Sequence, residues 1–529
     1  MLKTVDLFAG AGGLSLGFHR TKKIQIVAAA EINENASKTY INNFQKDNIA
    51  PIELIRNIVG YDFRSLIEKH QSIDLVIGGP PCQGFSNANR QKNHVISMNN
   101  ILVKEYFRAI KELQPRAFVM ENVSMLQSDT HRFYDSSIDH NEVVKYGIQM
   151  RPDIISVADT NVVATITGLL SIVKSEAAIK ENMISEKLFS KLNVLYKNRN
   201  NPSRLPRFIK VNKTAISNLI TTALENNITE YNRVRLQIIY ATLAAEEYHA
   251  ESCEEALSSL VSFQKTLQRA QEIYNNKLIH TFEQQADGTI IANVQSYSVI
   301  EYVDAILGTS YKQVGSTVNA LWFGVPQDRK RYITMGVRAD VLGDRELYML
   351  EEPGSYETIT VEDAIFDLKD YPVSEEKAPA PIDIMVPDMP ISEYAKRMRD
   401  SKQLHNHIVT SSTPEAIKRF KAISEGKNFH SLSKELTTTY SKPARTQNTI
   451  YLRLNRKAPS GTVVNVRKSM WIHPELHRAI SVREAARLQS FPDSFVFYGT
   501  KDSQYQQVGN AVPPLLAKAI ADHILAYIE

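Results

Sequence analysis

Short apolar runs alternate with helical patterns over the first 123 residues, and this alternation constrains the fold most. Five runs rich in Val, Ile, Leu and Ala are too short for helices and predict strands: Thr4–Phe8, Ile24–Ala30, Ile52–Ile55, Ile73–Ile77 and Ala117–Met120. Asn99–Leu113 instead has apolar residues at positions 102, 103, 106, 107 and 110, which is typical of a helix. Strands that alternate with helices pair in parallel and are covered on both faces. We therefore expect an α/β protein with a Rossmann-like doubly wound sheet.

The alternation stops at about residue 128, and the remaining chain divides by pattern. Residues 129–300 have mostly helical periodicity, as in Val162–Lys174 and Glu255–Tyr274, and contain no motif or repeat, so we predict a helical insertion. The sheet is expected to resume within residues 301–338. Residues 339–470 are polar with Gly and Pro and predict a smaller domain, and residues 471–529 return to helices.

The first strand runs directly into the glycine-rich turn Ala9-Gly10-Ala11-Gly12-Gly13-Leu14 and then into a helix. This order is typical of the nucleotide-binding opening of a doubly wound sheet, where glycines let the ligand approach the backbone. Glu31 follows the second strand, where a carboxylate can accept hydrogen bonds from the ribose hydroxyls of an adenosine ligand. Taken alone, the turn is common in α/β proteins and Glu31 is equally typical of a solvated loop.

A thiol stands on the rigid loop Gly78-Gly79-Pro80-Pro81-Cys82-Gln83-Gly84, directly after the fourth strand. Ligands of open α/β sheets bind at such strand ends. The chain holds only two cysteines, Cys82 and Cys253, so no disulfide framework is expected. A small buried cysteine is the common alternative, and we assign that role to Cys253. The stiff polar turn on both sides of Cys82 favours a nucleophile.

Polar and charged residues stand at the ends of two further expected strands: Glu121 ends Ala117–Met120, and Gln327 to Arg331 precede Tyr332–Val337. Glu121 ends the strand next to that of Cys82, so its carboxylate is expected in the same crevice. Gln327, Arg329 and Arg331 lie at spacing two, which places their side chains on one face of an extended chain. A solvated basic edge would show the same spacing.

Composition limits the class of protein. The 529 residues are 43% hydrophobic and 23% charged with a net charge of +4, which permits an anionic partner. The sequence has no apolar run of 18 residues and no apolar signal core before Asp6. With only two cysteines, we expect a cytoplasmic protein.

Six motifs in order resemble the DNA (cytosine-5) methyltransferase family of prokaryotic restriction-modification systems. They cover about 1–125 and 315–529 and are Asp6-Leu7-Phe8-Ala9-Gly10-x-Gly12-Gly13, Gly79-x-Pro81-Cys82-Gln83, Glu121-Asn122-Val123, Gln327-x-Arg329-x-Arg331, Arg483-Glu484-x-x-Arg487-Leu488-Gln489 and Gly509-Asn510-x-Val512. The resemblance implies a catalytic domain formed by residues 1–128, 301–338 and 471–529, and a target-recognition domain at 339–470. It also implies that the last helix packs beside the first strands and completes the cofactor site.

The resemblance further implies S-adenosylmethionine as methyl donor, duplex DNA as substrate and no metal. It makes Cys82 the nucleophile that adds to C6 of a flipped-out cytosine, with Glu121, Arg329 and Arg331 assisting. The residues implied around the cofactor are Phe8, Ala9, Gly10, Gly12, Gly13, Leu14, Glu31, Ile32, Asn57, Ile58, Pro81, Leu102, Asn510 and Val512. A cognate restriction endonuclease or another defence protein is the expected partner, and association with the nucleoid would follow from DNA binding.

The sequence departs from the family pattern in three places. Residues 130–300 have no counterpart in compact members, Asn57 replaces an aspartate and Ile32 replaces a larger ring. Three alternatives stay open at this point: an RNA methyltransferase on the same fold, a binding module that has kept the fold, and a nicotinamide enzyme that uses the glycine-rich turn.

Overall fold

The computed structural model describes residues 1–47, 50–81, 99–122, 132–201, 204–246, 251–376, 379–385, 390–440 and 443–529. The chain forms two compact units, of which unit 1 comprises 1–82, 101–126 and 306–529, and unit 2 comprises 83–100 and 127–305. Unit 1 thus holds the segments expected to form the catalytic domain together with residues 339–470. Unit 2 holds the whole expected insertion, residues 129–300.

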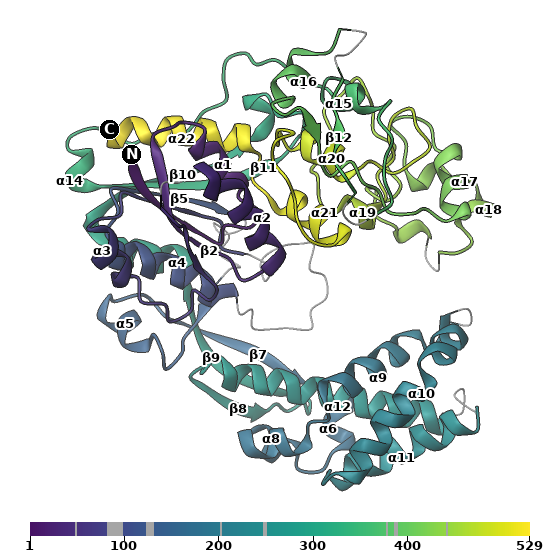
Figure 1. The fold of residues 1–529 in the computed structure, drawn as a ribbon. Helices are drawn as coiled ribbons and strands as arrows, with labels where there is room; N and C mark the ends of the chain where they lie inside the picture. Colours follow the sequence, from purple (N-terminus) through teal and green to yellow (C-terminus); the bar gives the residue numbers. More distant parts are fainter. Residues whose placement is uncertain are drawn as a thin grey trace. The chain divides into compact units, whose positions relative to one another are not determined.

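A seven-stranded sheet in the order β10-β11-β5-β4-β1-β2-β3 forms the centre of unit 1 (Figure 1). Its strands are β1 (Leu2–Leu7), β2 (Ile24–Ala30), β3 (Glu53–Ile55), β4 (Leu75–Gly78), β5 (Ala117–Asn122), β10 (Tyr311–Asn319) and β11 (Lys330–Arg338). The first five pair in parallel, whereas β11 is antiparallel to both β5 and β10. The expected Rossmann-like α/β fold is confirmed. Because the strand order reverses at β1, ligands are expected beside the carboxyl ends of β1 and β4.

Helices cover both faces of this sheet (Figure 1). They include α1 (Gly13–His19), α2 (Glu34–Phe44) and α22 (Pro514–Ile528) on one face and α3 (Arg64–His70) and α4 (Asn99–Leu113) on the other. Coverage on both sides explains why β4 is buried at every position and apolar throughout. The central strands therefore provide a rigid base for the loops at their carboxyl ends.

The C-terminal helix α22 lies against α1, the helix that follows the first strand. A Cβ placed on Gly17 would lie 2.3 Å from the Cβ of Ala517 and 2.4 Å from the amide nitrogen of Lys518. Only glycine permits this approach, because a methyl group there would overlap the backbone of α22. The two ends of the chain are thereby joined in one core.

Residues 339–470 contain short elements and a small core of their own. The helices are α14 (Ala339–Leu342), α15 (Val361–Ile365), α16 (Glu393–Met398), α17 (Pro414–Ala422), α18 (Lys434–Thr437) and α19 (Val466–Ser469), and β12 (Ile382–Asp383) pairs with β13 (Gln403–Leu404). Phe420 of α17 packs with Phe429, Tyr451 and Ile472 in a cluster separate from the main core. The chain then continues through α20 (Val482–Leu488) and α21 (Lys501–Asn510) to α22.

Unit 2 combines helices with a sheet that the periodicity did not predict. The strands are β6 (Arg132–Tyr134), β7 (Arg151–Ala158), β8 (His280–Gln284) and β9 (Ile290–Ser298). Each of the first three has antiparallel pairing with β9. In β9 the side chains alternate between buried and half-buried from Ile290 to Gln295, a period of two that the helical interpretation missed. The expected mostly helical segment thus also contains these strands, which the periodicity did not indicate.

The helices of unit 2 are α5 (His140–Lys145), α6 (Thr160–Thr165), α7 (Leu169–Val173), α8 (Glu176–Asn182), α9 (Glu186–Asn198), α10 (Arg204–Glu225), α11 (Glu230–Ala244), α12 (Glu251–Asn275) and α13 (Val299–Leu307). The expected helix Val162–Lys174 is instead two short helices, because Gly168 between them adopts a left-handed φ of 75°. Within α12, Cys253 is buried, in agreement with a structural role.

Among the described residues, one helical stretch, Lys501–Ile528, has the length and hydropathy of a membrane span. It comprises α21 and α22, and most of its apolar part is buried inside unit 1. This burial is typical of core helices in water-soluble folds.

Candidate active site

The turn after β1 has an unusual backbone. Phe8, Gly10 and Gly12 all adopt positive φ, at 61°, 56° and 95°. Such a conformation is costly for a bulky residue like Phe8, and it is found where a site requires it. A Cβ on Gly12 would lie 2.3 Å from the Phe44 ring, whereas one on Gly10 would meet no atom within 4 Å. The turn is therefore packed on one side and open at Gly10, where a ligand can approach the backbone.

Gly13 and Val512 bring the glycine-rich turn and the C-terminal motif together. A Cβ on Gly13 would lie 2.3 Å from the carbonyl oxygen of Val512, so only glycine fits. Ala9 and Leu14 are buried beside this contact, and Val512 is buried as well. Asn510 is exposed, and its Oδ1 accepts a hydrogen bond of 2.6 Å from Gln506.

Glu31 lies beside the open part of the turn. Its Oε2 accepts a hydrogen bond of 2.8 Å from the Gly10 amide, and its Oε1 accepts one of 2.7 Å from the Asn33 amide. Burial raises the pKa of Glu31, while these amides and Arg56 act in the opposite direction. The carboxylate thus fixes the turn and remains next to the open space, where a ribose hydroxyl could reach its remaining lone pairs.

Apolar side chains stand near the ends of β2 and β3. Ile32 is 77% exposed and Val59 is 46% exposed, whereas Ile58 is buried. Asn57 is exposed, and its Oδ1 accepts a hydrogen bond of 3.0 Å from the Val59 amide. Exposed aliphatic side chains of this kind provide a surface on which a flat aromatic ring can lie.

A buried polar cluster behind the turn was not singled out from the sequence. Asp6, on β1, is 1% exposed, and its Oδ2 accepts a hydrogen bond from the Ser15 hydroxyl, which lies 2.7 Å from the Tyr40 hydroxyl. The other oxygen, Oδ1, is buried without a hydrogen-bond partner among the described residues. Burial raises the pKa of Asp6 to about 7, although Ser15 and Tyr40 lower it. A carboxyl group inside an apolar strand was the available signal.

Cys82 itself lies outside the described residues, as do Gln83 to Met98. The start of its loop is described: the Gly79 amide donates a hydrogen bond of 3.3 Å to the Leu7 carbonyl. Pro81 and Leu102 are half-buried. A Cβ on Gly79 would lie 3.1 Å from Oε2 of Glu121, so the Glu121 carboxylate lies against the loop three residues before Cys82.

Glu121 and Arg331 form an ion pair at the edge where β5 meets β11. Nε of Arg331 lies 2.7 Å from Oε1 of Glu121, and the two side chains are 17% and 15% exposed. Strand register explains the pairing, because Tyr332 lies opposite Asn122 and Ile333 lies opposite Glu121. A carboxylate and a guanidinium are thus held together beside Gly79, three residues before Cys82.

Arg329 lies deeper than Arg331 and holds the motif segments together. It is 1% exposed, and its Nη1 and Nη2 donate hydrogen bonds to the carbonyls of Val463 and Gly509 at 2.9 and 3.0 Å. Burial lowers the pKa of Arg329, and the charge of Arg331 acts in the same direction. These contacts favour a positioning role for Arg329.

Gln327 reinforces the same arrangement. Its Nε2 donates to Oε1 of Gln489 at 2.8 Å, and its Oε1 accepts from the Val463 amide at 2.7 Å. Gln489 in turn donates to the Val508 carbonyl at 2.8 Å. Gln327 and Arg329 therefore point to one side of the chain. Their side chains and that of Gln489 form one buried hydrogen-bonded network with backbone carbonyls such as that of Gly509.

The charged residues of α20 are structural. Glu484 caps its own helix through the Ser481 amide and binds Arg478 through both oxygens, at 2.7 and 2.8 Å. Arg478 charge lowers the pKa of Glu484 to about 2 against the effect of burial. Arg487 binds both oxygens of Asp493 at 2.8 and 2.6 Å, and Arg483 donates to carbonyls. None of these side chains is exposed.

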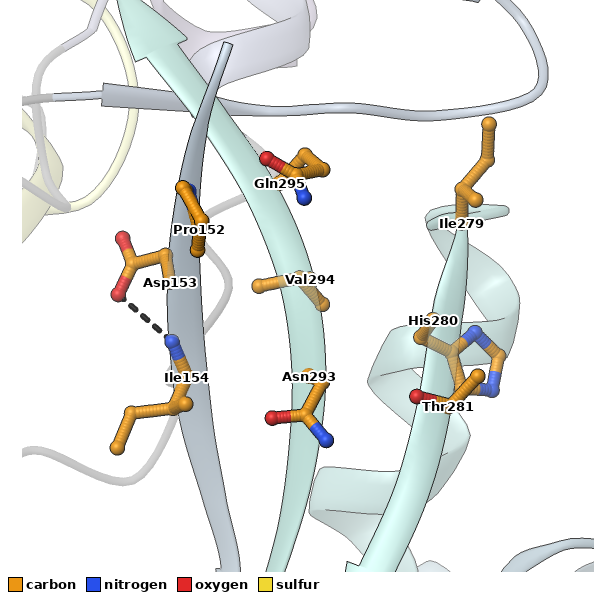
Figure 2. A pocket seen from close by; sticks show the side chains of 9 residues that line it. All are labelled: Pro152, Asp153, Ile154, Ile279, His280, Thr281, Asn293, Val294 and Gln295. Carbon is orange, nitrogen blue, oxygen red and sulfur yellow. Dashed lines mark hydrogen bonds between the residues drawn. The ribbon is translucent and has the colours of Figure 1, made fainter.

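An open hollow in unit 2 is unrelated to these residues (Figure 2). It lies over β7, β8 and β9 and includes none of the predicted site residues; its lining is Pro152, Asp153, Ile154, Ile279, His280, Thr281, Asn293, Val294 and Gln295. Oδ1 of Asp153 accepts a hydrogen bond of 2.8 Å from the Ile154 amide. The motif residues, and not this hollow, define the candidate site.

Comparison with known proteins agrees with the geometry. A family model for C-5 cytosine-specific DNA methylases matches residues 2–164 and 298–526. The type II methyltransferase M.DdeI of Desulfomicrobium norvegicum is 33% identical over 43% of this chain and 59% of its own. M1.HphI of Haemophilus parahaemolyticus is 24% identical over 99% of this chain and 87% of its own.

Among solved structures, a candidate DNA modification methyltransferase encoded within an E. coli prophage aligns over 100% of this chain and 99% of that chain, with a TM-score of 0.55 and 18% identity. That similarity shows the fold. The sheet, the glycine-rich turn and the strand-end carboxylates define a methyltransferase of the Rossmann-like class. By the family match over most of its length, the chain belongs to the C-5 cytosine-specific DNA methylase family, which confirms the resemblance drawn from the six motifs.

Proposed function

We propose that this DNA methyltransferase transfers a methyl group from S-adenosylmethionine to C5 of a cytosine flipped out of duplex DNA, through a covalent bond between Cys82 and C6. The observation that carries the proposal is the Glu121–Arg331 ion pair of 2.7 Å, held against the loop that leads to Cys82. A carboxyl group and a guanidinium beside the segment that precedes Cys82 in the sequence suit the chemical needs of this reaction.

The turn after β1 fits the proposed methyl donor. Space is open at Gly10, the Glu31 carboxylate stands beside it, and Ile32 offers an exposed apolar face. Glu31 would hold the ribose, while Ile32, Asn57 and Ile58 would surround the adenine. S-adenosylmethionine supplies an electrophilic methyl group when bound. The fit depends on this chain keeping the left-handed turn at Phe8, Gly10 and Gly12.

Cytosine C5 is a weak nucleophile, and the proposed residues increase its reactivity. The Cys82 thiolate adds to C6, and the displaced π electron pair builds density at C5, with charge also developing at N3. Glu121 hydrogen-bonds at N3, and Arg331 holds O2, so both stabilise that charge. C5 would take the methyl group with S-adenosylhomocysteine as the leaving group. C5 then loses its proton to a base, the C5–C6 double bond re-forms, and the Cys82 thiolate is expelled.

Base flipping requires extensive contacts with the DNA backbone, because unstacking costs a few kcal/mol. Residues 339–470 carry the second small core of unit 1, and we propose them as the target-recognition domain that reads base edges in the major groove. Since relatives are named type II methyltransferases, we propose a role beside a cognate restriction endonuclease in the cytoplasm.

Trapping tests the covalent step directly. Duplex DNA with 5-fluorocytosine at the target position cannot lose a proton from C5, so the adduct should persist at Cys82 and be found there by peptide mass spectrometry. Cys82→Ala should abolish methyl transfer while retaining donor binding, with Cys253→Ala as the matched control that keeps full activity. An adduct on another residue, or substantial turnover by Cys82→Ala, would falsify the nucleophile assignment.

Labelled donor tests the reaction itself. Incubation of the full chain with duplex DNA and a methyl-labelled donor should place the label on C5 of cytosine after nuclease digestion. Label on an exocyclic nitrogen, or only on RNA, would contradict the proposal. Sequencing of methylated positions would then give the target sequence.

A further inference from the structure

A strongly basic segment of unit 2 has no role in the chemistry described above. The 27 residues from Lys187 to Lys213 contain eight Lys and Arg and no Asp or Glu, and the next acid is Glu225. With 62 Lys plus Arg and 58 Asp plus Glu in 529 residues, about three of each would be expected. The family model leaves residues 165–297 unmatched, so the segment lies outside what family members share.

The segment forms α9 and the first half of α10, whose apolar sides are buried. Leu188, Leu192 and Leu195 of α9 pack with Leu205 and Ile209 of α10 in one core cluster. The cations therefore face solvent. Five are exposed, and we call them the basic face: Lys187, Lys197, Arg204, Arg207 and Lys210.

Carboxylates do not neutralise the basic face. Two neighbouring cations are paired, since Arg199 lies 3.3 Å from Glu254 and Lys213 lies 3.1 Å from Glu246. Within the described part of the chain, none of the five residues of the basic face forms an ion pair with an acid. Exposed cations in proteins are usually interspersed with acids, because like charges repel at short range.

Lys265 of α12 extends this positive region beside an aromatic ring. The Tyr196 ring has the Arg199 guanidinium 3.9 Å from its centroid and the Lys265 ammonium 5.4 Å from it. Burial lowers the pKa of Lys265, and Lys197, Arg269 and Arg199 lower it further, with Asp159 opposing. The crowding of cations here is electrostatically unfavourable and would be relieved by a bound polyanion.

We propose that the basic face binds the phosphate backbone of duplex DNA and gives the enzyme a second, sequence-independent DNA contact. Long cationic side chains without acidic partners suit phosphates, which carry one charge per about 1.7 Å of duplex axis. Duplex DNA is the polyanion that the proposed function supplies, so the inference rests on that function. The contact increases the residence of the enzyme on DNA and leaves target choice to residues 339–470.

The salt dependence of DNA binding tests the inference in the full chain. The triple variant Arg204→Gln, Arg207→Gln, Lys210→Gln keeps good helix formers at exposed positions of α10. The matched control neutralises three exposed cations of unit 2 outside α9, α10 and α12: Lys145→Gln, Arg151→Gln, Lys174→Gln. Binding to a non-specific duplex is measured against salt concentration, and circular dichroism confirms folding.

The slope of log K against log salt is negative, and each lost phosphate contact reduces its magnitude by about 0.9. The triple variant should therefore have a slope that is smaller in magnitude by between about two and three. Affinity at about 0.1 M salt should fall ten- to a hundredfold, kcat for methylation should stay unchanged and KM for long duplexes should rise. The control variant should behave as the parent. A second variant on α9, Lys187→Gln with Lys197→Gln, should lower the slope by up to about two.

Two results would overturn the inference: equal slopes for the basic-face variants and the control, or a slope change seen with single-stranded RNA but not with duplex DNA. Methylation by the parent chain separates this from failure of the proposed function. If the parent methylates cytosine in DNA but the slopes are equal, only the second contact is lost.

Discussion

Replacement of Asp6 by asparagine should change how the stability of unit 1 depends on pH. The unfolding free energy of the variant minus that of the parent should rise as the pH rises. Asp6 is 1% exposed on β1, and burial raises its pKa to about 7 from the ordinary value of 3.8. Asparagine has nearly the same shape, does not ionise and keeps an oxygen that can accept from Ser15.

The magnitude follows from linkage between proton binding and folding. Between pH 3.8 and about 7 the unfolded chain has an ionised Asp6, whereas the folded chain keeps it protonated. The folded state thus binds one more proton, and stability falls as pH rises, by about 1.4 kcal/mol per pH unit. The fall begins near pH 4 and ends near pH 7. From pH 5.5 to 8 it amounts to about 2 kcal/mol, which the asparagine variant does not lose.

Tryptophan fluorescence during urea unfolding is a suitable measurement. The chain has two tryptophans, Trp322 and Trp471, and both belong to unit 1 with Asp6. The difference in unfolding free energy, variant minus parent, should therefore rise by about 2 kcal/mol between pH 5.5 and 8. Ser15→Ala removes a hydrogen bond that lowers the pKa of Asp6, so it should move the end of the fall above pH 7. A difference that is constant with pH would refute the reasoning.

Three further substitutions test the site and its support. Glu121→Gln breaks the ion pair with Arg331 and should lower kcat by about a hundredfold or more, with KM for DNA nearly unchanged; a change confined to KM would remove Glu121 from the reacting centre. Arg329→Lys cannot reach both carbonyls and should cost about 1–3 kcal/mol in the urea unfolding of unit 1, and unchanged stability would contradict the buried network. Gly17→Ala would place a methyl group 2.3 Å from Ala517 and should cost about 1–3 kcal/mol, read as a lower thermal midpoint; a higher midpoint would mean that α1 and α22 separate without penalty.

Local patterns determined the elements that alternate along the chain. The predicted strand Ile24–Ala30 and helix Asn99–Leu113 have the bounds found in the structure. The strand is an apolar run too short for a helix, and the helix has a clear apolar period over fifteen residues. The strands β7, β8 and β9 of unit 2 were missed, since their alternation involves half-buried residues and competes with helical patterns on both sides. Interruption of the expected helix Val162–Lys174 at Gly168 was a backbone effect that apolar spacing does not report.

The candidate site shows the same division. By itself the sequence determined the family and the order of its motifs, because glycines, prolines and charged residues at fixed spacings are local properties of the chain. Only the tertiary structure decided their roles: Arg329 and Arg331 are two residues apart, yet one is buried on two carbonyls and the other pairs with Glu121. The segments that bury and bind these two arginines are more than a hundred residues away in the sequence. Those contacts determine the position of each guanidinium and, for Arg329, the lowered pKa.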